Sequence, residues 1–542
     1  MNARLAIRNL LTGIILTVAA SAPALTRIGI VADTHIGAPG AAARLEQSYR
    51  LLKSHGVTNI FNLGDIADSH VDAWYKEYAD IRTRVYPDGV DEVFVYHNHD
   101  KFGFHTAETN TARFLEEAFA ATQRKLGAKN GRYHSFKLEG FTFLVYPLGV
   151  DYRRMEAEIQ SSVAADPGKP VFVLDHVPPL GTSAGSEHHH AGNAATAAIF
   201  RKYPQIVALT GHVHGSTANE GKIWQREFTA VGFGTTKKPA AKHADYQIAI
   251  MELDPQKAVI RRYSLATGKE FRADDPWTLT FPFDPLHPRY SREARAKTTP
   301  QPAFAADAKP EVVPDHDHLG GLVVSFPGAR PAEWTAHYSV NIEDGHHDHD
   351  HPRSAVRAGA GLYAVPKKHR PSTITAKLDP GLFTPGETVK VSVTPNGFFG
   401  NKGAPITSEP TTITNQVEEG WTTVFDGLPK GARKGAFVKS RKFLFPADVW
   451  DAPPGTPYRF MFELSVKQFE HPGMFAISTP DHNQFIGKNR MYEGDWTRRF
   501  SFTSPRPKGK GPWFFNVVGG TNLVQIHSFT ILRKDGPRPS KP

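Results

Sequence analysis

The chain has 542 residues, 22% of them charged and 40% hydrophobic, which is the composition of an ordinary soluble globular protein with room for two to four domains. It contains no cysteine, so disulfides and attachment through a lipidated cysteine are both excluded. The formal net charge is +10, but the Lys and Arg are scattered apart from patches such as residues 506–510. This distribution favours a solvated basic surface over a nucleic-acid-binding stripe.

The first 24 residues have the pattern of a secretory signal peptide. Arg4 and Arg8 precede the apolar stretch Leu10–Ala20, and residues 22–24 (Ala-Pro-Ala) offer small side chains for cleavage before Leu25. An uncleaved anchor is the alternative, but the apolar stretch is far shorter than the ~20 residues that span a bilayer. We therefore expect a secreted or periplasmic protein with no membrane span after cleavage.

From about residue 27 to 265, strand patterns alternate with helical patterns. The expected strands are Ile28–Ala32, Thr58–Leu63, Glu92–Tyr96, Thr142–Tyr146, Val171–Leu174, Ile206–Leu209, Gln247–Glu252 and Val259–Tyr263. Helices are expected around Ala41–Ser54, Val71–Arg84 and Thr106–Leu126. The spacing of about 30 residues between Asp33, Asp65 and Asn98 matches one βαβ unit per step. Residues 25–282 are therefore predicted to form an α/β domain.

Five short polar blocks stand where predicted strands end. They are Asp33-Thr34-His35, Gly64-Asp65, Asn98-His99-Asp100, His176 and Gly211-His212-Val213-His214. In open α/β sheets the carboxyl ends of the strands carry the ligand crevice, so these side chains are expected to converge. A mixture of carboxylate, carboxamide and imidazole suits two divalent metal ions, with Mn, Fe or Zn as candidates.

The blocks resemble the calcineurin-like metallophosphoesterase superfamily, whose pattern is DxH, GD, GNH(D/E), H and GHxH in that order. The resemblance covers roughly residues 26–265 and implies a four-layer α/β/β/α sandwich that binds two metal ions. One departure is visible, because His97 stands where the family usually has the glycine before Asn98. We expect His97 to alter the local shape of the pocket and to remove no ligand.

The resemblance also implies roles for individual residues. Asp65, alone after a glycine at a strand end, suits a carboxylate that bridges both metals. One site is completed by Asp33, His35 and His214, and the other by Asn98, His176 and His212. His99 is expected to act as the general acid that protonates the leaving alcohol, a structural histidine being the alternative. Asp68 either pairs with this histidine or caps the helix that begins near Val71.

Two histidine-rich segments fall outside these blocks. The loop Ser183–Asn193, with His188, His189 and His190, could line the cleft, although a mobile polar loop is favoured. The tract His346–His351, with His316 and His318 nearby, could bind zinc, but its spacing does not fix a tetrahedral site. A disordered loop is the favoured interpretation of this tract.

Residues 283–318 are rich in Pro and Ala and are predicted to be a linker. From 319 to 412 only strand patterns follow, at Leu322–Pro327, His337–Glu343 and Thr373–Leu378. The segment Leu382–Gly400 resembles the late strands of a fibronectin type III or similar immunoglobulin-like sandwich.

Residues 415–535 carry strands at jelly-roll spacing, namely Tyr458–Leu464, Asp495–Ser504, Trp513–Val518 and Val524–Leu532. This region resembles a galactose-binding-like carbohydrate module. Tyr492, Trp496 and Trp513 could stack on sugar rings, but a Trp within an alternating strand is more typical of a core. The expected fold is therefore an α/β domain followed by two all-β sandwich domains.

The leading functional hypothesis is a secreted or periplasmic binuclear-metal phosphoesterase that hydrolyses phosphate mono- or diesters. One alternative is a polysaccharide-associated binding protein with an inactive phosphoesterase-like domain. The seven intact ligand positions argue against such decay. An extracellular nuclease is the other alternative, and nucleic acid is expected only as its substrate. A polysaccharide is a possible partner of the C-terminal domain.

Overall fold

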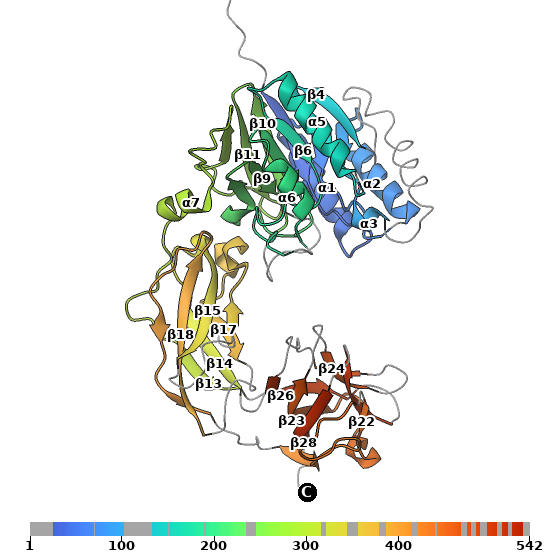
Figure 1. Cartoon of the computed structure of the whole chain (residues 1–542), viewed down its shortest axis with the longest axis vertical. Helices are drawn as coiled ribbons and strands as arrows, with labels where there is room; N and C mark the ends of the chain where they lie inside the picture. The colour runs from blue at the N-terminus through green and yellow to red at the C-terminus, as the bar shows by residue number, and fades with distance from the viewer. Residues whose placement is uncertain are drawn as a thin grey trace, which may run out of the picture. The chain divides into compact units, whose positions relative to one another are not determined.

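A computed structural model describes most of the chain (Figure 1). Two compact units are present, one of Met1–Pro239 with Asp245–Ser291 and one of Ala240–Ala244 with Arg292–Pro542. The described residues are 25–69, 71–101, 133–149, 151–188, 191–234, 245–315, 321–343, 356–378, 386–413, 420–439, 442–467, 474–478, 484–487, 496–506, 512–518 and 523–534. The predicted signal peptide, the predicted helix Thr106–Leu126 and the tract His346–His351 lie outside them, as do His189, His190, His316, His318 and Tyr492.

The first unit contains two six-stranded sheets. One has the order β12-β11-β10-β1-β2-β3 and consists of β1 (Thr26–Val31), β2 (Asn59–Asn62), β3 (Asp91–Phe94), β10 (Gln247–Asp254), β11 (Lys257–Ser264) and β12 (Trp277–Thr280). The other has the order β4-β5-β6-β7-β9-β8 and consists of β4 (His134–Leu138), β5 (Phe141–Val145), β6 (Val171–Leu174), β7 (Ile206–Thr210), β8 (Ile223–Gln225) and β9 (Thr229–Gly232). Within them β1-β2-β3 and β5-β6-β7-β9 pair in parallel, so their carboxyl ends share an edge.

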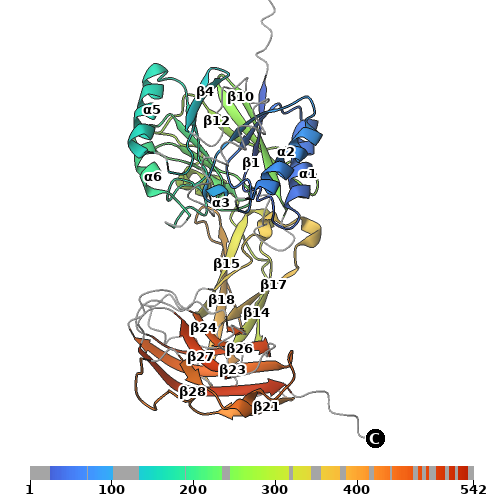
Figure 2. The ribbon, with the colours of Figure 1, turned by 90° about the vertical axis from the view of Figure 1, so that its right-hand side faces the viewer.

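Three hydrophobic clusters place the sheets and helices of this unit. One cluster joins both sheets, and in it Phe61 of β2 lies 5.3 Å from Phe143 of β5 between ring centroids. In a second cluster, helix residues such as Leu45 pack on the outer face of the sheet that contains β1. In a third cluster, helix residues such as Met155 pack on the outer face of the sheet that contains β5. The helices are α1 (Ala41–Ser54), α2 (Asp72–Val85), α3 (Asn98–Lys101), α5 (Tyr152–Ala165) and α6 (Ala194–Phe200). Figure 2 shows α1 and α2 on one side of the strands and α5 and α6 on the other.

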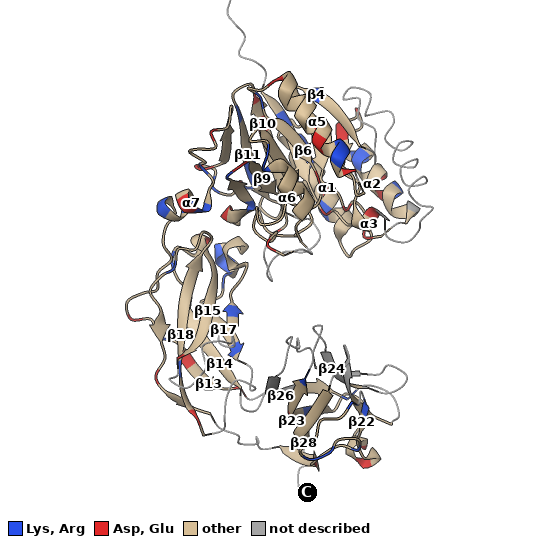
Figure 3. Ribbon diagram, viewed as in Figure 1, with Lys and Arg blue, Asp and Glu red and all other residues tan. Residues whose placement is uncertain are grey.

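The predicted strands of this unit match the observed ones to within about two residues, because buried parallel strands are apolar on both faces. In β2 and β6 every residue is buried. The strands β4, β8, β9 and β12 and the helices α5 and α6 were not predicted. Among the described residues, no helix combines the length and apolar character needed to cross a bilayer. Helices α2 and α5 both carry charges of both signs (Figure 3), and each contains an i,i+4 ion pair, Lys76–Asp80 in α2 and Arg154–Glu158 in α5.

The predicted linker 283–318 contains ordered elements, which corrects that prediction. Helix α7 (Arg292–Thr298) lies in it, and β13 (Glu311–Pro314) pairs antiparallel with β14 (Leu322–Pro327). The strand β13 is a short edge strand with half-exposed residues, so it carries too few buried positions to show a pattern in the sequence.

The second unit contains two groups of strands with separate cores. In the first group, β13-β14-β17 and β16-β15-β18-β19 form two sheets, in which β20 also pairs with β18. Besides β13 and β14, the strands are β15 (Thr335–Glu343), β16 (Val356–Ala358), β17 (Thr373–Leu378), β18 (Thr388–Gly397), β19 (Ile406–Thr407) and β20 (Thr411–Thr412). One hydrophobic cluster takes residues from both sheets, including Phe326 of β14 and Tyr338 of β15.

The last group also forms two sheets, β21-β28-β23-β26 and β22-β27-β24-β25. The strands are β21 (Trp421–Asp426), β22 (Lys442–Leu444), β23 (Pro457–Lys467), β24 (Met474–Ser478), β25 (Gln484–Gly487), β26 (Trp496–Pro505), β27 (Phe514–Val518) and β28 (Leu523–Lys534). Trp513 is 2% exposed and packs 5.5 Å from Trp450, so it is a core residue rather than a platform for sugars.

Candidate metal centre

The loops that leave the parallel strands are tied to one another by backbone hydrogen bonds. Asp33 N donates to Gly64 O at 3.0 Å and His35 N to Asp65 O at 3.0 Å, which holds the loops after β1 and β2 side by side. In the second sheet Gly211 N donates to His176 O at 2.9 Å. His212 N donates to Asp33 Oδ1 at 3.1 Å and joins the loops of the two sheets. The polar blocks therefore meet at the carboxyl ends of the parallel strands, as expected.

Five predicted ligands adopt a backbone conformation that side chains normally avoid. Seven non-glycine residues of the described ranges have positive φ, and five of these are Asp33, His35, Asp65, His212 and His214, with φ between 45° and 68°. Such a conformation costs of order 1–3 kcal/mol per residue and persists only where the surrounding structure imposes it. Strain gathered at these positions marks them as a functional site.

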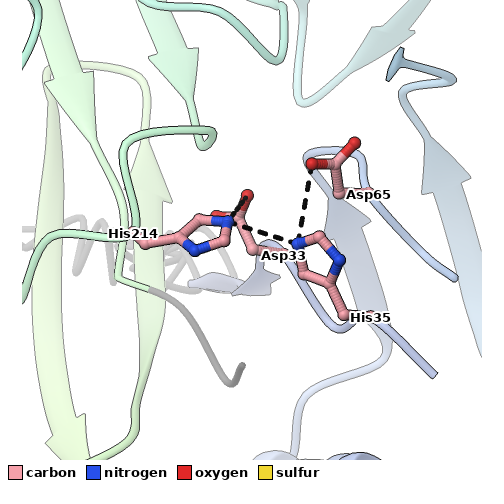
Figure 4. Close-up of side chains that lie close together, drawn as sticks. All are labelled: Asp33, His35, Asp65 and His214. Carbon is pink, nitrogen blue, oxygen red and sulfur yellow. Dashed lines mark hydrogen bonds and ion pairs between the residues drawn. The ribbon is translucent and has the colours of Figure 1, made fainter. Parts of the chain in front are cut away.

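The first group of side chains lies between β1, β2 and the GHxH loop, which is residues Gly211–His214 after β7 (Figure 4). His214 Nε2 is 3.2 Å from Asp33 Oδ1 and 3.2 Å from His35 Nε2, and His35 Nε2 is 3.6 Å from Asp65 Oδ2. Two ligand atoms on one small divalent ion lie about 3.0–3.4 Å apart, since each is about 2.1 Å from it. The two distances of 3.2 Å fall in this range and the distance to Asp65 is slightly longer, so the four side chains are close to the spacing of one ligand set. Their ligand atoms all lie within 4.8 Å of one another.

The second group shares Asp65 with the first. His176 Nε2 is 3.1 Å from Asp65 Oδ2 and 3.3 Å from His212 Nδ1. The other ring nitrogen of His176, Nδ1, donates to Leu63 O at 2.6 Å, which leaves Nε2 for an ion. Asp65 thus stands between both groups, which is the position predicted for a bridging carboxylate.

Gly64 is required beside this imidazole. Its φ is +97°, and a Cβ added there would lie 2.6 Å from His176 Nδ1. Any side chain at this position would therefore push the imidazole out of the cluster, in addition to straining the turn. The glycine of the Gly64-Asp65 block is explained by both effects.

His99 lies at the edge of the cluster. Its backbone N–H donates to Asp65 Oδ1 at 3.1 Å, and its Nδ1 donates to Asp68 O at 2.9 Å. The ring centroid is 4.6 Å from that of His35. The side chain is half-buried.

The carboxylate of Asp68 does not cap helix α2, which was one of its two predicted roles. Helix α2 has Val71 as its N-cap and no side-chain cap hydrogen bond, so the prediction that Asp68 caps this helix is wrong. Instead Asp68 Oδ1 accepts from His35 Nδ1 at 3.1 Å, while its backbone carbonyl holds His99. The backbone bonds of Ile36 N to Ile66 O and of Asp68 N to Ile36 O, both 2.9 Å, hold this part of the loop against the loop after β1, beside His35.

Three residues near the cluster were not predicted from the sequence to be ligands or catalytic residues. Asp100 is buried and accepts hydrogen bonds from Ile66 N at 3.0 Å and Tyr75 Oη at 3.1 Å, and its burial, with the charge of Asp65, raises its pKa to about 7. The position of Asp100 at the end of the Asn98-His99-Asp100 block could have indicated that it belongs to the site. His97 and Lys222 also lie against the cluster, and no motif marks Lys222.

The electrostatics of the cluster favour a bound cation. Burial raises the pKa of Asp65, but its hydrogen bond to His176 and the nearby imidazoles outweigh this and hold the pKa below its ordinary value. Burial lowers the pKa of His176, but Asp65 and Asp33 raise it to about 9. The buried carboxylates therefore require positive charge, which a proton on His176 supplies in the metal-free protein and a divalent ion would supply in its place.

Residues 26–216 match the family model described as calcineurin-like phosphoesterase. This segment is a calcineurin-like phosphoesterase domain. The sequence resemblance to that superfamily is thereby confirmed for the domain, and the clustered Asp and His residues fit the binding of divalent metal.

Several solved structures are similar to this chain at low identity. A dimetal phosphatase from Danio rerio is 13% identical, with 47% of this chain and 99% of that chain covered and a TM-score of 0.35. GAP50, titled as the anchor in the inner membrane complex of Plasmodium, is 12% identical, with 48% and 92% covered and a TM-score of 0.34. Purple acid phosphatase PPD1 from yellow lupin (Lupinus luteus) seeds is 14% identical, with 47% and 54% covered and a TM-score of 0.34. No curated protein matches the chain. Likenesses this weak say nothing of what the chain binds or cleaves.

Proposed function

We propose that the phosphoesterase domain hydrolyses phosphate mono- or diesters with two divalent ions. One ion would be held by Asp33, His35, Asp65 and His214, and the other by Asp65, Asn98, His176 and His212. The observation that carries this proposal is the position of Asp65, whose Oδ2 lies 3.6 Å from His35 Nε2 and 3.1 Å from His176 Nε2. When bound, such a pair of ions supplies hydroxide at neutral pH and offsets the charge of the phosphoryl oxygens.

His99 is proposed as the general acid. Its Nδ1–H donates to the carbonyl of Asp68, so the imidazolium can lose its Nε2 proton and keep this hydrogen bond. The proton would pass from Nε2 to the oxygen of the leaving alcohol, which is then expelled as a neutral molecule. The backbone bond from His99 N to Asp65 Oδ1 fixes this residue next to the bridging carboxylate.

Asp68 is proposed as a positioning residue. Its carboxylate accepts from His35 Nδ1, which selects the tautomer whose lone pair is on Nε2 and orients the ring toward Asp65. The side chain of Asp68 is 36% exposed, so it also adds negative charge at the mouth of the site.

We further propose that the domain has the four-layer α/β/β/α arrangement and that the chain is secreted or periplasmic, with residues 1–24 as its signal peptide. The two β-only regions are proposed to be sandwiches, of fibronectin type III-like and galactose-binding-like kind. In support, each has one core that takes residues from two sheets. The pairing of β13 with β14 moves the start of the first sandwich to about residue 311.

The experiment that tests the function is a panel of phosphate mono- and diesters assayed with Mn, Fe or Zn added to metal-free protein. We expect turnover that requires added metal, since the protein groups alone provide no hydroxide at neutral pH. A protein that binds two ions and turns over no ester would contradict the proposal. Cleavage of plasmid DNA that weakens steeply with salt would assign the site to the nuclease alternative.

A further inference from the structure

His97 lies inside the second ligand group. It lies three residues after the end of β3, takes the place of the glycine that the family usually has before Asn98, and is only 6% exposed. One ring nitrogen of His97, one carboxylate oxygen of Asp65 and one ring nitrogen of His176 all lie within 4.8 Å of one another. The imidazole therefore points into the cluster and away from solvent.

The ring spacing is that of imidazoles on a common ion. An imidazole bound through one nitrogen has its centroid about 3.2 Å from the ion, so two at angles of about 90–110° have centroids about 4.5–5.2 Å apart. The predicted ligand pairs meet this value, with 5.0 Å for His35–His214 and 5.1 Å for His176–His212. The pair His97–His176 meets it as well, at 4.5 Å. The centroids of His97 and His212 are 6.2 Å apart, which corresponds to a wider angle of about 150° at the ion, as for opposite ligands of a five-coordinate site.

The tautomer of His97 is also set for an ion. Its Nδ1 lies 2.7 Å from Asn98 Oδ1, and because an amide oxygen only accepts, Nδ1 carries the proton. The lone pair of His97 then resides on Nε2. Hydrogen bonding of one ring nitrogen to a fixed acceptor is the usual way in which a metal-ligating histidine is oriented.

We propose that His97 is a metal ligand of the second site, in addition to those of the family pattern. The assignment rests on the proposed binuclear site and deepens it. With His97, the second site has one carboxylate, one carboxamide and three imidazoles, whereas the first has two carboxylates and two imidazoles. Nitrogen-rich sites favour Zn over Mn more strongly than oxygen-rich ones, so the two sites differ in the metal that they prefer.

The test is a competition titration of metal-free protein with Zn and with Mn against a chromophoric chelator. His97→Phe keeps a buried ring against His176 but has no nitrogen, and His97→Gly restores the residue usual in the family. We expect both to weaken one of two zinc ions by about tenfold or more and to leave the other unchanged, since even indirect contacts to a ligand are worth 10–100-fold. His134→Phe, at another buried histidine of the same domain, is the matched control and should bind both ions normally.

Each outcome decides a different point. Wild-type zinc affinity in His97→Phe would show that the ring only packs against His176, and the proposal would be wrong while the binuclear site stands. Wild-type protein that binds no ion would instead overturn the proposed function. If neither variant folds, a structure of the zinc-loaded wild type decides: a His97 nitrogen about 2.0–2.1 Å from the ion supports the assignment, and one beyond about 3 Å overturns it.

Discussion

Lys222 is a buried charge beside the candidate metal centre, and its replacement by Met is expected to stabilise the protein. The residue ends a short 3-10 helix, Glu220–Lys222, and is 1% exposed. Its ammonium has no hydrogen-bond partner among the residues that the structure describes. A Cβ on Gly215 would lie 2.5 Å from Nζ, so the ammonium packs against the turn that follows His214.

The magnitude follows from the pKa of this group. Burial lowers the pKa of Lys222 from 10.5 to about 8, although Asp33 and Glu187 favour its charged form. This lower pKa corresponds to a destabilisation of about 3 kcal/mol at pH 7, where the lysine is mostly charged in both the folded and the unfolded protein. Between pH 8 and 10.5 the unfolded chain binds more protons than the folded one. The stability of the wild type should therefore rise across that window as the folded lysine becomes neutral.

Urea unfolding of metal-free protein, followed by tryptophan fluorescence, measures this effect. Lys222→Met should raise the free energy of unfolding by up to about 3 kcal/mol at pH 7 and by little above pH 10.5. Lys169→Met, at a side chain that is 43% exposed, is the control and should change stability by no more than about 0.5 kcal/mol. A loss of stability in Lys222→Met, or an equal gain at both pH values, would refute the reasoning.

Three further outcomes are expected at the site. His99→Ala should slow ester turnover ~10²–10⁴-fold with unchanged metal content, and wild-type turnover would disprove its role as general acid. Gly64→Ala should weaken metal binding in a titration, because its Cβ would lie 2.6 Å from His176 Nδ1. Gly168→Ala is the control and should bind metal normally, because its Cβ would have no atom within 4 Å among the described residues. Zinc affinity should fall as pH falls below about 9, because the proton that Asp65 holds on His176 must leave before the ion binds. Calorimetry in buffers of different ionisation enthalpy measures the number of protons released on binding. A zinc affinity that does not depend on pH would contradict this prediction.

The candidate site was largely predictable because its residues follow from strand ends. The apolar runs of β1, β2 and β7 are fully buried at their carboxyl ends, and parallel pairing brings the blocks that follow them to one edge. A polar block directly after an apolar strand was therefore enough to predict that Asp33, Asp65 and His214 lie close together. The shared position of Asp65 was likewise expected from its motif.

What the sequence did not reveal depends on contacts between distant segments. The orientation of His97 toward His176 joins residues 79 positions apart in different sheets, and the packing of Lys222 against the GHxH loop has no local signature. The carboxylate of Asp68 turned to His35 because the loops after β1 and β2 are bonded together. Short elements such as β13 were missed because three or four residues are too few to show a period.

The central claim is that Asp65 is shared by two ions, and counting bound metal in two variants tests it most directly. After equilibration with zinc and removal of the excess, elemental analysis should find about two ions in the wild type, about one in His35→Ala, which loses a ligand of the first site only, and none in Asp65→Asn. Two ions held by Asp65→Asn with wild-type affinity, or none held by the wild type, would contradict the account.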